Sequence, residues 1–128
     1  MGIMDALAGR QQAVSPEEVA SELAPFLASG ERVERAFRVM RDMLVFTNRR
    51  LISIDRQGVT GKKVDYRSVP YSNITMFSKE SAGVLDFDAE LKLWVRGLEH
   101  PLQFSFNRDA PINDVYQVMS EHILGSTE

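Results

Sequence analysis

The sequence predicts a mainly β fold in which an N-terminal helix precedes seven short strands and a second helix closes the chain. Two patterns carry this prediction. Between residues 31 and 107, apolar residues recur mainly at every second position, the period of a half-buried strand. Before and after that region they recur every three to four residues, the period of a helix that buries one face. We therefore divide the 128 residues into an N-terminal helical arm, residues 1–29, and one β-rich domain, residues 30–128.

The first helix is predicted over residues 16–28. Ser15 stands at the N-cap position, Pro16 follows in the first turn, and Glu18 completes a capping box. An apolar stripe follows at helical spacing, formed by Val19, Leu23, Phe26 and Leu27. This stripe has to be buried, either on the domain's own sheet or on a neighbouring subunit, and the pattern leaves both arrangements open.

Seven strands are predicted between segments of turn residues. They cover residues 33–39, 43–47, 51–54, 64–68, 74–77, 85–96 and 102–106. The sixth is the most regular, because apolar residues from Leu85 to Val95 alternate with charged or aromatic residues from Asp86 to Arg96. An antiparallel sheet of this length curls into a barrel or a sandwich, and a helix is able to cover an open end.

The second helix is predicted over residues 110–124. Asp109 is the expected N-cap, and Pro111 is expected in the first turn. One apolar face is formed by Ile112, Val115, Met119 and Ile123 at helical spacing. We expect this face to plug the open end of the sheet structure.

The composition argues against several classes of function. The chain carries 15 basic and 18 acidic residues, and its net charge of −3 argues against general nucleic-acid binding and against binding to anionic membranes. It contains no Cys, which excludes disulfides and Cys-based zinc sites. Its longest uninterrupted apolar stretch, Leu23–Ala28, is far shorter than the about 20 residues that a membrane-spanning helix needs. We therefore expect a cytoplasmic protein.

No arrangement of residues predicts a catalytic, cofactor-binding or metal site. The segment Gly58–Lys63 lacks the glycine spacing of a phosphate-binding P-loop, and its strand-like flanks differ from the helices around a KH clamp. It is more typical of a solvated turn. The two histidines, His100 and His122, belong to no recognisable triad motif. We therefore expect a protein that is not an enzyme and has no cofactor.

Four segments carry a family resemblance. They are Leu44–Leu51, Gly58–Lys63, Val69–Ile74 and Leu85–Trp94. Together they resemble the bacterial pleckstrin-homology-like (PH-like) domain family, formerly a family of unknown function. The resemblance implies a seven-stranded bent antiparallel barrel capped by the C-terminal helix, with the N-terminal helix as an addition. It also implies a non-enzymatic interaction module that forms a cyclic homo-oligomer, with five members expected, and that binds a further, unidentified protein.

The strongest candidate for a self-association surface is the only tryptophan. Trp94 is predicted to face outward between Lys92 and Arg96, where it is either a surface ring lying on a neighbouring strand or an interface anchor. The strand at residues 74–77 carries no charge to protect an exposed edge. With the helical stripe included, the candidate interface residues are Trp94, Phe77, Met76, Ile74, Leu23 and Phe26.

Two sets of polar residues are further candidates for binding surfaces. A row on the sixth strand, formed by Asp86, Asp88, Glu90 and Lys92, is either a solvated strand face or a surface for a basic partner segment. A basic set formed by Arg38, Arg41, Lys62 and Lys63 lies near two turns that share one end of a PH-like barrel. If these four bases cluster, the alternative function is a small-molecule or lipid-headgroup domain that recognises an inositol-phosphate-like anion.

Overall fold

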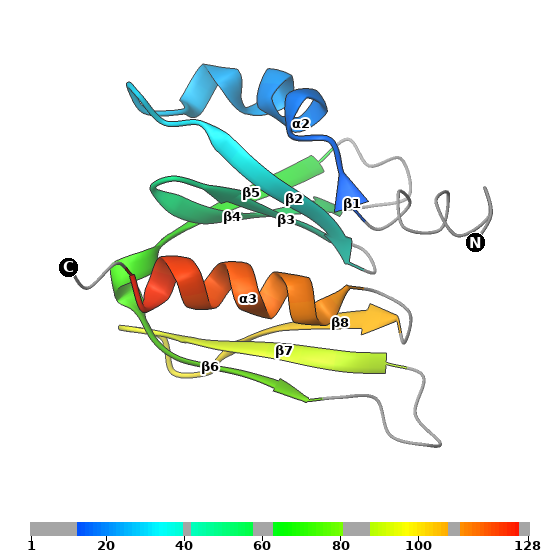
Figure 1. The fold of residues 1–128 in the computed structure, drawn as a ribbon, viewed down its shortest axis with the longest axis vertical. Helices are drawn as coiled ribbons and strands as arrows, with labels where there is room; N and C mark the ends of the chain where they lie inside the picture. Colours follow the sequence, from blue (N-terminus) through cyan, green and yellow to red (C-terminus); the bar gives the residue numbers. More distant parts are fainter. Residues whose placement is uncertain (1–12, 40–41, 58–62, 81–87, 108–110, 126–128) are drawn as a thin grey trace.

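The computed structural model describes residues 13–39, 42–57, 63–80, 88–107 and 111–125. These residues form two antiparallel sheets, one of five strands and one of three, together with two α-helices (Figure 1). The molecule is layered: helix α2 (Pro16–Leu23) covers the outer face of the larger sheet, and helix α3 (Ile112–Ile123) lies between the two sheets. The mainly β prediction is therefore confirmed.

The five-stranded sheet has the strand order β1-β2-β3-β4-β5. Its strands are β1 (Ala13–Val14), β2 (Val33–Val39), β3 (Asp42–Thr47), β4 (Arg50–Gln57) and β5 (Lys63–Pro70). The centre of β3 and β4 is buried on both faces, because α2 covers one face and the main core lies against the other. This two-sided burial explains why the centres of these strands, Leu44–Phe46 and Leu51–Ile54, are apolar at every position except Ser53.

The three-stranded sheet has the order β6-β7-β8, and a 3₁₀ turn at Tyr71–Asn73 connects it to β5. Its strands are β6 (Ile74–Glu80), β7 (Asp88–Val95) and β8 (Leu102–Asn107). In β7, Leu91 and Leu93 are fully buried, whereas Lys92 and Trp94 lie on the opposite, outer face. The predicted alternation is confirmed for this part, and residues 85–87 lie outside the described residues.

Helix α3 supplies the centre of the main core. Val115 and Met119 are fully buried and Val118 is nearly so, while Ile112 and Ile123 pack against the same cluster at the two ends of the helix. This is the plug that the apolar face predicts. Pro111 occupies the N-cap position and not the first turn, and Asp109 lies outside the described residues.

Helix α2 differs from its prediction in two ways. It ends at Leu23 and continues only as a 3₁₀ turn at Ala24–Phe26, because Pro25 has no N–H to donate to a further helical turn. The predicted capping box is wrong: the Ser15 hydroxyl donates to the Glu17 carboxylate at 2.7 Å, and no side chain caps the helix backbone.

A buried ion pair fixes the chain after α2 to the β3–β4 hairpin. The Glu31 carboxylate is fully buried and accepts two hydrogen bonds from the Arg50 guanidinium, at 2.8 and 2.9 Å. The Thr47 hydroxyl donates a third at 2.6 Å, and the Ala28 N–H donates a fourth at 2.8 Å. The Arg50 hydrogen bonds are the main reason that the pKa of Glu31 falls to about 2.

Candidate interaction surfaces

The part of the apolar stripe that lies on α2 is buried on the protein's own sheet. Val19 and Leu23 form a second hydrophobic cluster with side chains of β2, β3 and β4. Glu22 reinforces the docking, because its carboxylate pairs with Arg56 at 2.8 Å and accepts the Tyr66 hydroxyl at 2.6 Å. Of the two arrangements that the sequence left open, the structure shows packing within the same chain.

The two histidines take different places. His100 is exposed in the turn before β8. His122, near the end of α3, stacks on Tyr71 with 4.5 Å between ring centroids, and its Nε2 lies 3.0 Å from the Glu34 carboxylate of β2. These contacts join the end of α3 to the five-stranded sheet, so His122 has a clear structural role.

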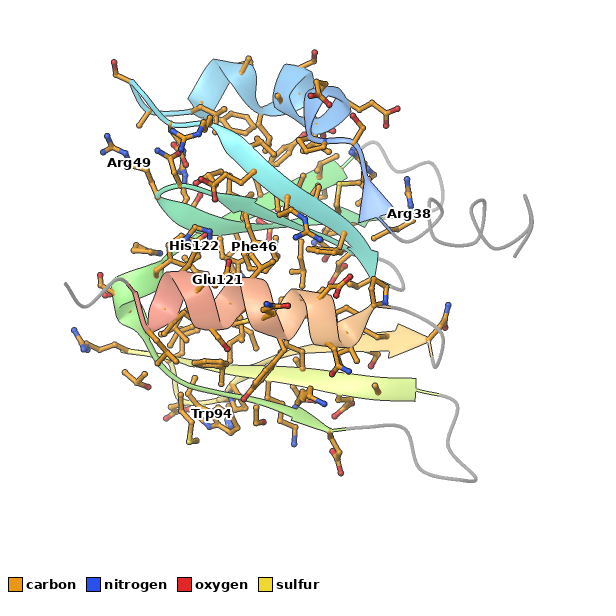
Figure 2. All side chains as sticks on the ribbon, in the orientation of Figure 1. Arg38, Phe46, Arg49, Trp94, Glu121 and His122 are labelled. Carbon is orange, nitrogen blue, oxygen red and sulfur yellow. The ribbon has the colours of Figure 1, made fainter. Side chains whose placement is uncertain are left out.

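Neither of the two described α-helices covers the outer face of the three-stranded sheet, and a cross-strand apolar pair lies on that face (Figures 1 and 2). Trp94 of β7 lies directly opposite Met76 of β6. Met76 is 51% exposed, and the half-buried Trp94 points away from the core on the same face. The structure thus places these two predicted interface residues together.

The other predicted interface residues of β6 point inward. Ile74 is only 5% exposed, and Phe77 packs against Tyr116 of α3 with ring centroids 5.1 Å apart. A register shift between Ile74 and Met76 separates them, so Met76 faces outward while Ile74 and Phe77 face the core. Ile74 and Phe77 are therefore removed from the candidate interface.

The two candidate interface residues in and just after α2, Leu23 and Phe26, differ in their exposure to solvent. Leu23 is fully buried within the chain's own core, which removes it from the candidate interface. Phe26 remains 43% exposed, and its ring contacts the Tyr66 ring with a centroid distance of 4.9 Å. Of the six predicted interface residues, the structure leaves Trp94, Met76 and Phe26 at the surface.

The acidic row on β7 is only partly described. Asp86 and the side chain of Asp88 lie outside the described residues. Glu90 and Lys92 are half-buried on the same outer face as Trp94, and Lys92 lies between Ser78 and Gln103 of the neighbouring strands. This part of the row is a polar border beside the Trp94–Met76 pair.

The structure does not bring together the two described members of the predicted basic set. Arg38 lies on the face of β2 that carries Ala36, which packs in the α2 cluster. Lys63 lies on the face of β5 that carries Val69, which belongs to the main core. Because alternate residues of a strand share a face, Arg38 and Lys63 project from opposite faces of one sheet. Arg41 and Lys62 lie outside the described residues.

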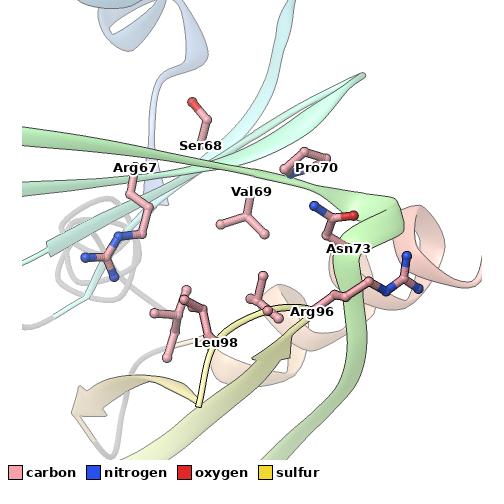
Figure 3. A pocket seen from close by; sticks show the side chains of 10 residues that line it. Arg67, Ser68, Val69, Pro70, Asn73, Arg96 and Leu98 are labelled. Carbon is pink, nitrogen blue, oxygen red and sulfur yellow. The ribbon is translucent and has the colours of Figure 1, made fainter. Parts of the chain in front are cut away.

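A groove that the sequence did not predict lies between the end of β5 and the turn that joins β7 to β8 (Figure 3). Its volume is about 480 Å³. Its lining is mostly apolar, with a few polar groups, and consists of Arg67, Ser68, Val69, Pro70, Asn73, Val95, Arg96, Gly97, Leu98 and Leu102. No sequence signal marks it, because its two walls meet only through tertiary packing.

Both walls of the groove contain sheet edges. β5 is the last strand of the larger sheet, and β8 is the last strand of the smaller one. Neither pairs with the other among the described strands, so their outer N–H and C=O groups have no partner strand. Such edges pair readily with an additional strand.

Neither a metal-binding cluster nor a membrane-spanning helix is found in the described part of the chain. Within it, no group of three or more His, Cys, Asp or Glu side chains has an arrangement that would hold a metal ion. None of its helices has the length and apolar character required to cross a membrane.

Comparison with known proteins identifies the fold family. Residues 2–123 match the family model of the bacterial PH domain. The uncharacterized protein YjqA of Bacillus subtilis (strain 168) is 46% identical over 121 residues, which cover 94% of this chain and 97% of that protein.

Two crystal structures have the same fold. A pleckstrin homology domain from Shewanella amazonensis SB2B has a TM-score of 0.79 at 43% identity, covering 87% of this chain and 100% of that one. A DUF1696 family protein with a pleckstrin-homology domain from Shewanella loihica PV-4 has a TM-score of 0.78 at 46% identity, covering 88% of this chain and 96% of that one. The resemblance in the sequence motifs is thereby confirmed, and the chain belongs to the bacterial PH domain family.

Proposed function

We propose that this chain is a non-enzymatic PH-like interaction module that assembles into a closed homo-oligomeric ring, which then serves as a scaffold for protein partners. The observation that carries the proposal is the Trp94–Met76 pair on the uncovered face of the three-stranded sheet. Tryptophan is enriched among residues that dominate interface energies, and Met76 is among the most exposed large apolar side chains. The neighbouring edge of β6 is unpaired among the described strands, which adds a means of extending the sheet between subunits.

The exposed apolar residues favour contact between unlike surfaces. Trp94 and Met76 lie on the outer face of the smaller sheet, whereas Phe26 follows α2 on the other side of the molecule (Figure 1). A contact between two different patches is heterologous, and such contacts close into rings when the rotation between subunits permits. Five members, the number expected from the family resemblance, would have a mass of about 72 kDa from chains of 14.5 kDa.

The alternative function, recognition of a small anion or an inositol-phosphate-like headgroup, finds no support in the described basic residues. Arg38 and Lys63 project from opposite faces of the sheet and are not placed to bind one anion together. We therefore expect titration with inositol phosphates to give no saturable binding. The non-enzymatic assignment rests on membership of the PH domain family.

Light scattering behind a sizing column tests the proposal. At micromolar concentration the full chain should elute as one species well above the 14.5 kDa of a monomer. Trp94→Ala should weaken assembly by more than about 1–2 kcal/mol per contact, because it removes an aromatic anchor. Arg49→Ala, at an exposed hairpin position, is the matched control and should leave the mass unchanged. A wild-type mass equal to that of the monomer would contradict the scaffold proposal.

A further inference from the structure

We propose that the groove between β5 and the β7–β8 turn binds a short extended segment of a partner protein, with an acidic residue at Arg96 and an apolar side chain between Val69 and Leu98. The inference rests on the proposed role as an interaction module, but it does not require the ring. The groove is a separate surface from the Trp94–Met76 pair, which lies on the outer face of the smaller sheet.

The size and lining of the groove suit a peptide side chain. Its volume of about 480 Å³ lies within the roughly 300–1,000 Å³ typical of ligand sites. Val69 and Leu98 lie across the groove from one another, and Leu98 is 53% exposed on the side of the turn (Figure 3). An apolar side chain inserted here would shield Leu98 from water, which is a favourable change.

The backbone around the groove suits an extended segment. β5 borders the groove over residues 67–70, and its outer edge pairs with no described strand. A peptide added along this edge gains main-chain hydrogen bonds, while its alternate side chains enter the groove. Pro70 has no N–H, so pairing along β5 has to use the residues before it.

The different charge environments of the two arginines in the groove favour one orientation of the bound segment. Arg96 and Arg67 lie toward opposite ends of the groove (Figure 3). Arg67 already lies 4.0 Å from the Asp65 carboxylate, whereas Arg96 forms no ion pair with any carboxylate in the described ranges. The unneutralised Arg96 is therefore the natural position for an acidic residue of the partner.

Beyond Arg67 the surface becomes acidic. A smaller cavity of about 200 Å³ shares Arg67 and Leu102 with the groove, and Asp42, Asp55 and Asp65 line it in a single cross-strand row. A segment that is acidic along its whole length would be repelled there. The preferred ligand therefore carries its acidic residue at one end only, followed by the apolar anchor.

Selection from a random peptide library displayed on phage tests this inference with the full chain as bait. Enriched peptides should share one acidic residue a few positions from an apolar, strand-favouring residue. In a titration with the most enriched peptide, labelled with fluorescein, Arg96→Glu and Leu98→Asp should each weaken binding by at least about tenfold. Arg49→Glu reverses an exposed charge elsewhere and should bind like the wild type.

Light scattering on the same samples separates this inference from the ring. Peptide binding by a wild-type chain that proves monomeric would support the groove while contradicting the scaffold. Failure to enrich a shared pattern, or binding that Arg96→Glu and Leu98→Asp leave unchanged, would overturn the inference. A mass that falls in Arg96→Glu would also overturn it, because a second copy of the chain would then occupy the groove.

Discussion

Glu31 shows how much one residue contributes to this fold. Its carboxylate is fully buried, and Arg50, Thr47 and the Ala28 N–H all donate to it. The sequence gives no sign of this network, because Glu31 and Arg50 are 19 positions apart and meet only when the hairpin closes against the chain after α2. Removing one partner of a buried pair typically costs about 3–5 kcal/mol, whereas an exposed pair contributes about 0–1 kcal/mol.

We therefore predict that Glu31→Gln lowers the free energy of unfolding by about 3 kcal/mol near pH 7. The folded-state pKa of Glu31 is about 2, below its ordinary value of 4.5, so its contribution is present above 4.5 and is lost as pH falls from 4.5 toward 2. The difference between wild type and variant, measured by urea unfolding, should shrink at about pH 3. A difference that does not vary with pH would contradict this account. Glu22→Gln, in a more exposed Glu–Arg pair, is the control and should cost no more than about 1 kcal/mol.

At the scale of single elements, periodicity predicted the strands and helices well but not their irregularities. The alternation in β7 and the apolar face of α3 are both present, because each faces one core. The register shift in β6 has no clear signature in the sequence, and it separates Met76 from Ile74 and Phe77. The short strand β1 was also missed, because two residues are too few to show a period.

The alternation of buried and outward-facing side chains in β7 predicts that substitutions at two neighbouring positions have very different effects on stability. Leu91→Ala should cost about 2–5 kcal/mol of unfolding free energy, because it leaves a cavity beneath a fully buried side chain. Lys92→Ala, one position along on the outer face, should cost less than about 0.5 kcal/mol. Chemical denaturation of both variants measures the contrast, and equal small effects would mean that the assignment of faces is off by one residue.

Helix α3 makes a second prediction at this scale. Val115 is fully buried between the sheets, so Val115→Asp should destabilise the protein by several kcal/mol or prevent folding. Asn113→Asp adds the same charge at an exposed position of the first turn and should melt like the wild type. Thermal melting followed by circular dichroism compares the two, and an unchanged melting temperature for Val115→Asp would be inconsistent with the plug.

At the scale of the whole molecule, the surfaces depend on contacts that no local pattern reports. The sequence correctly identified Trp94 as outward-facing, and it suggested a basic cluster that the described residues do not form. It could not indicate the groove, because its two walls, which contain Arg67 and Arg96, are 29 positions apart in sequence and meet only through the packing of the two sheets. Predicting such a site requires knowing how the two sheets are placed relative to one another. The periodicity of apolar residues along the sequence does not give this information.

We propose that copies of this chain assemble into a closed ring of fixed size. Native mass spectrometry distinguishes the possible assemblies, because a closed ring gives one stoichiometry whereas an open chain of heterologous contacts gives a ladder of masses. We predict a single dominant species, at about 72 kDa for five copies of 14.5 kDa, and its conversion to smaller species in Trp94→Ala. A monomer at 14.5 kDa, or a continuous ladder of masses, would show that no closed ring forms.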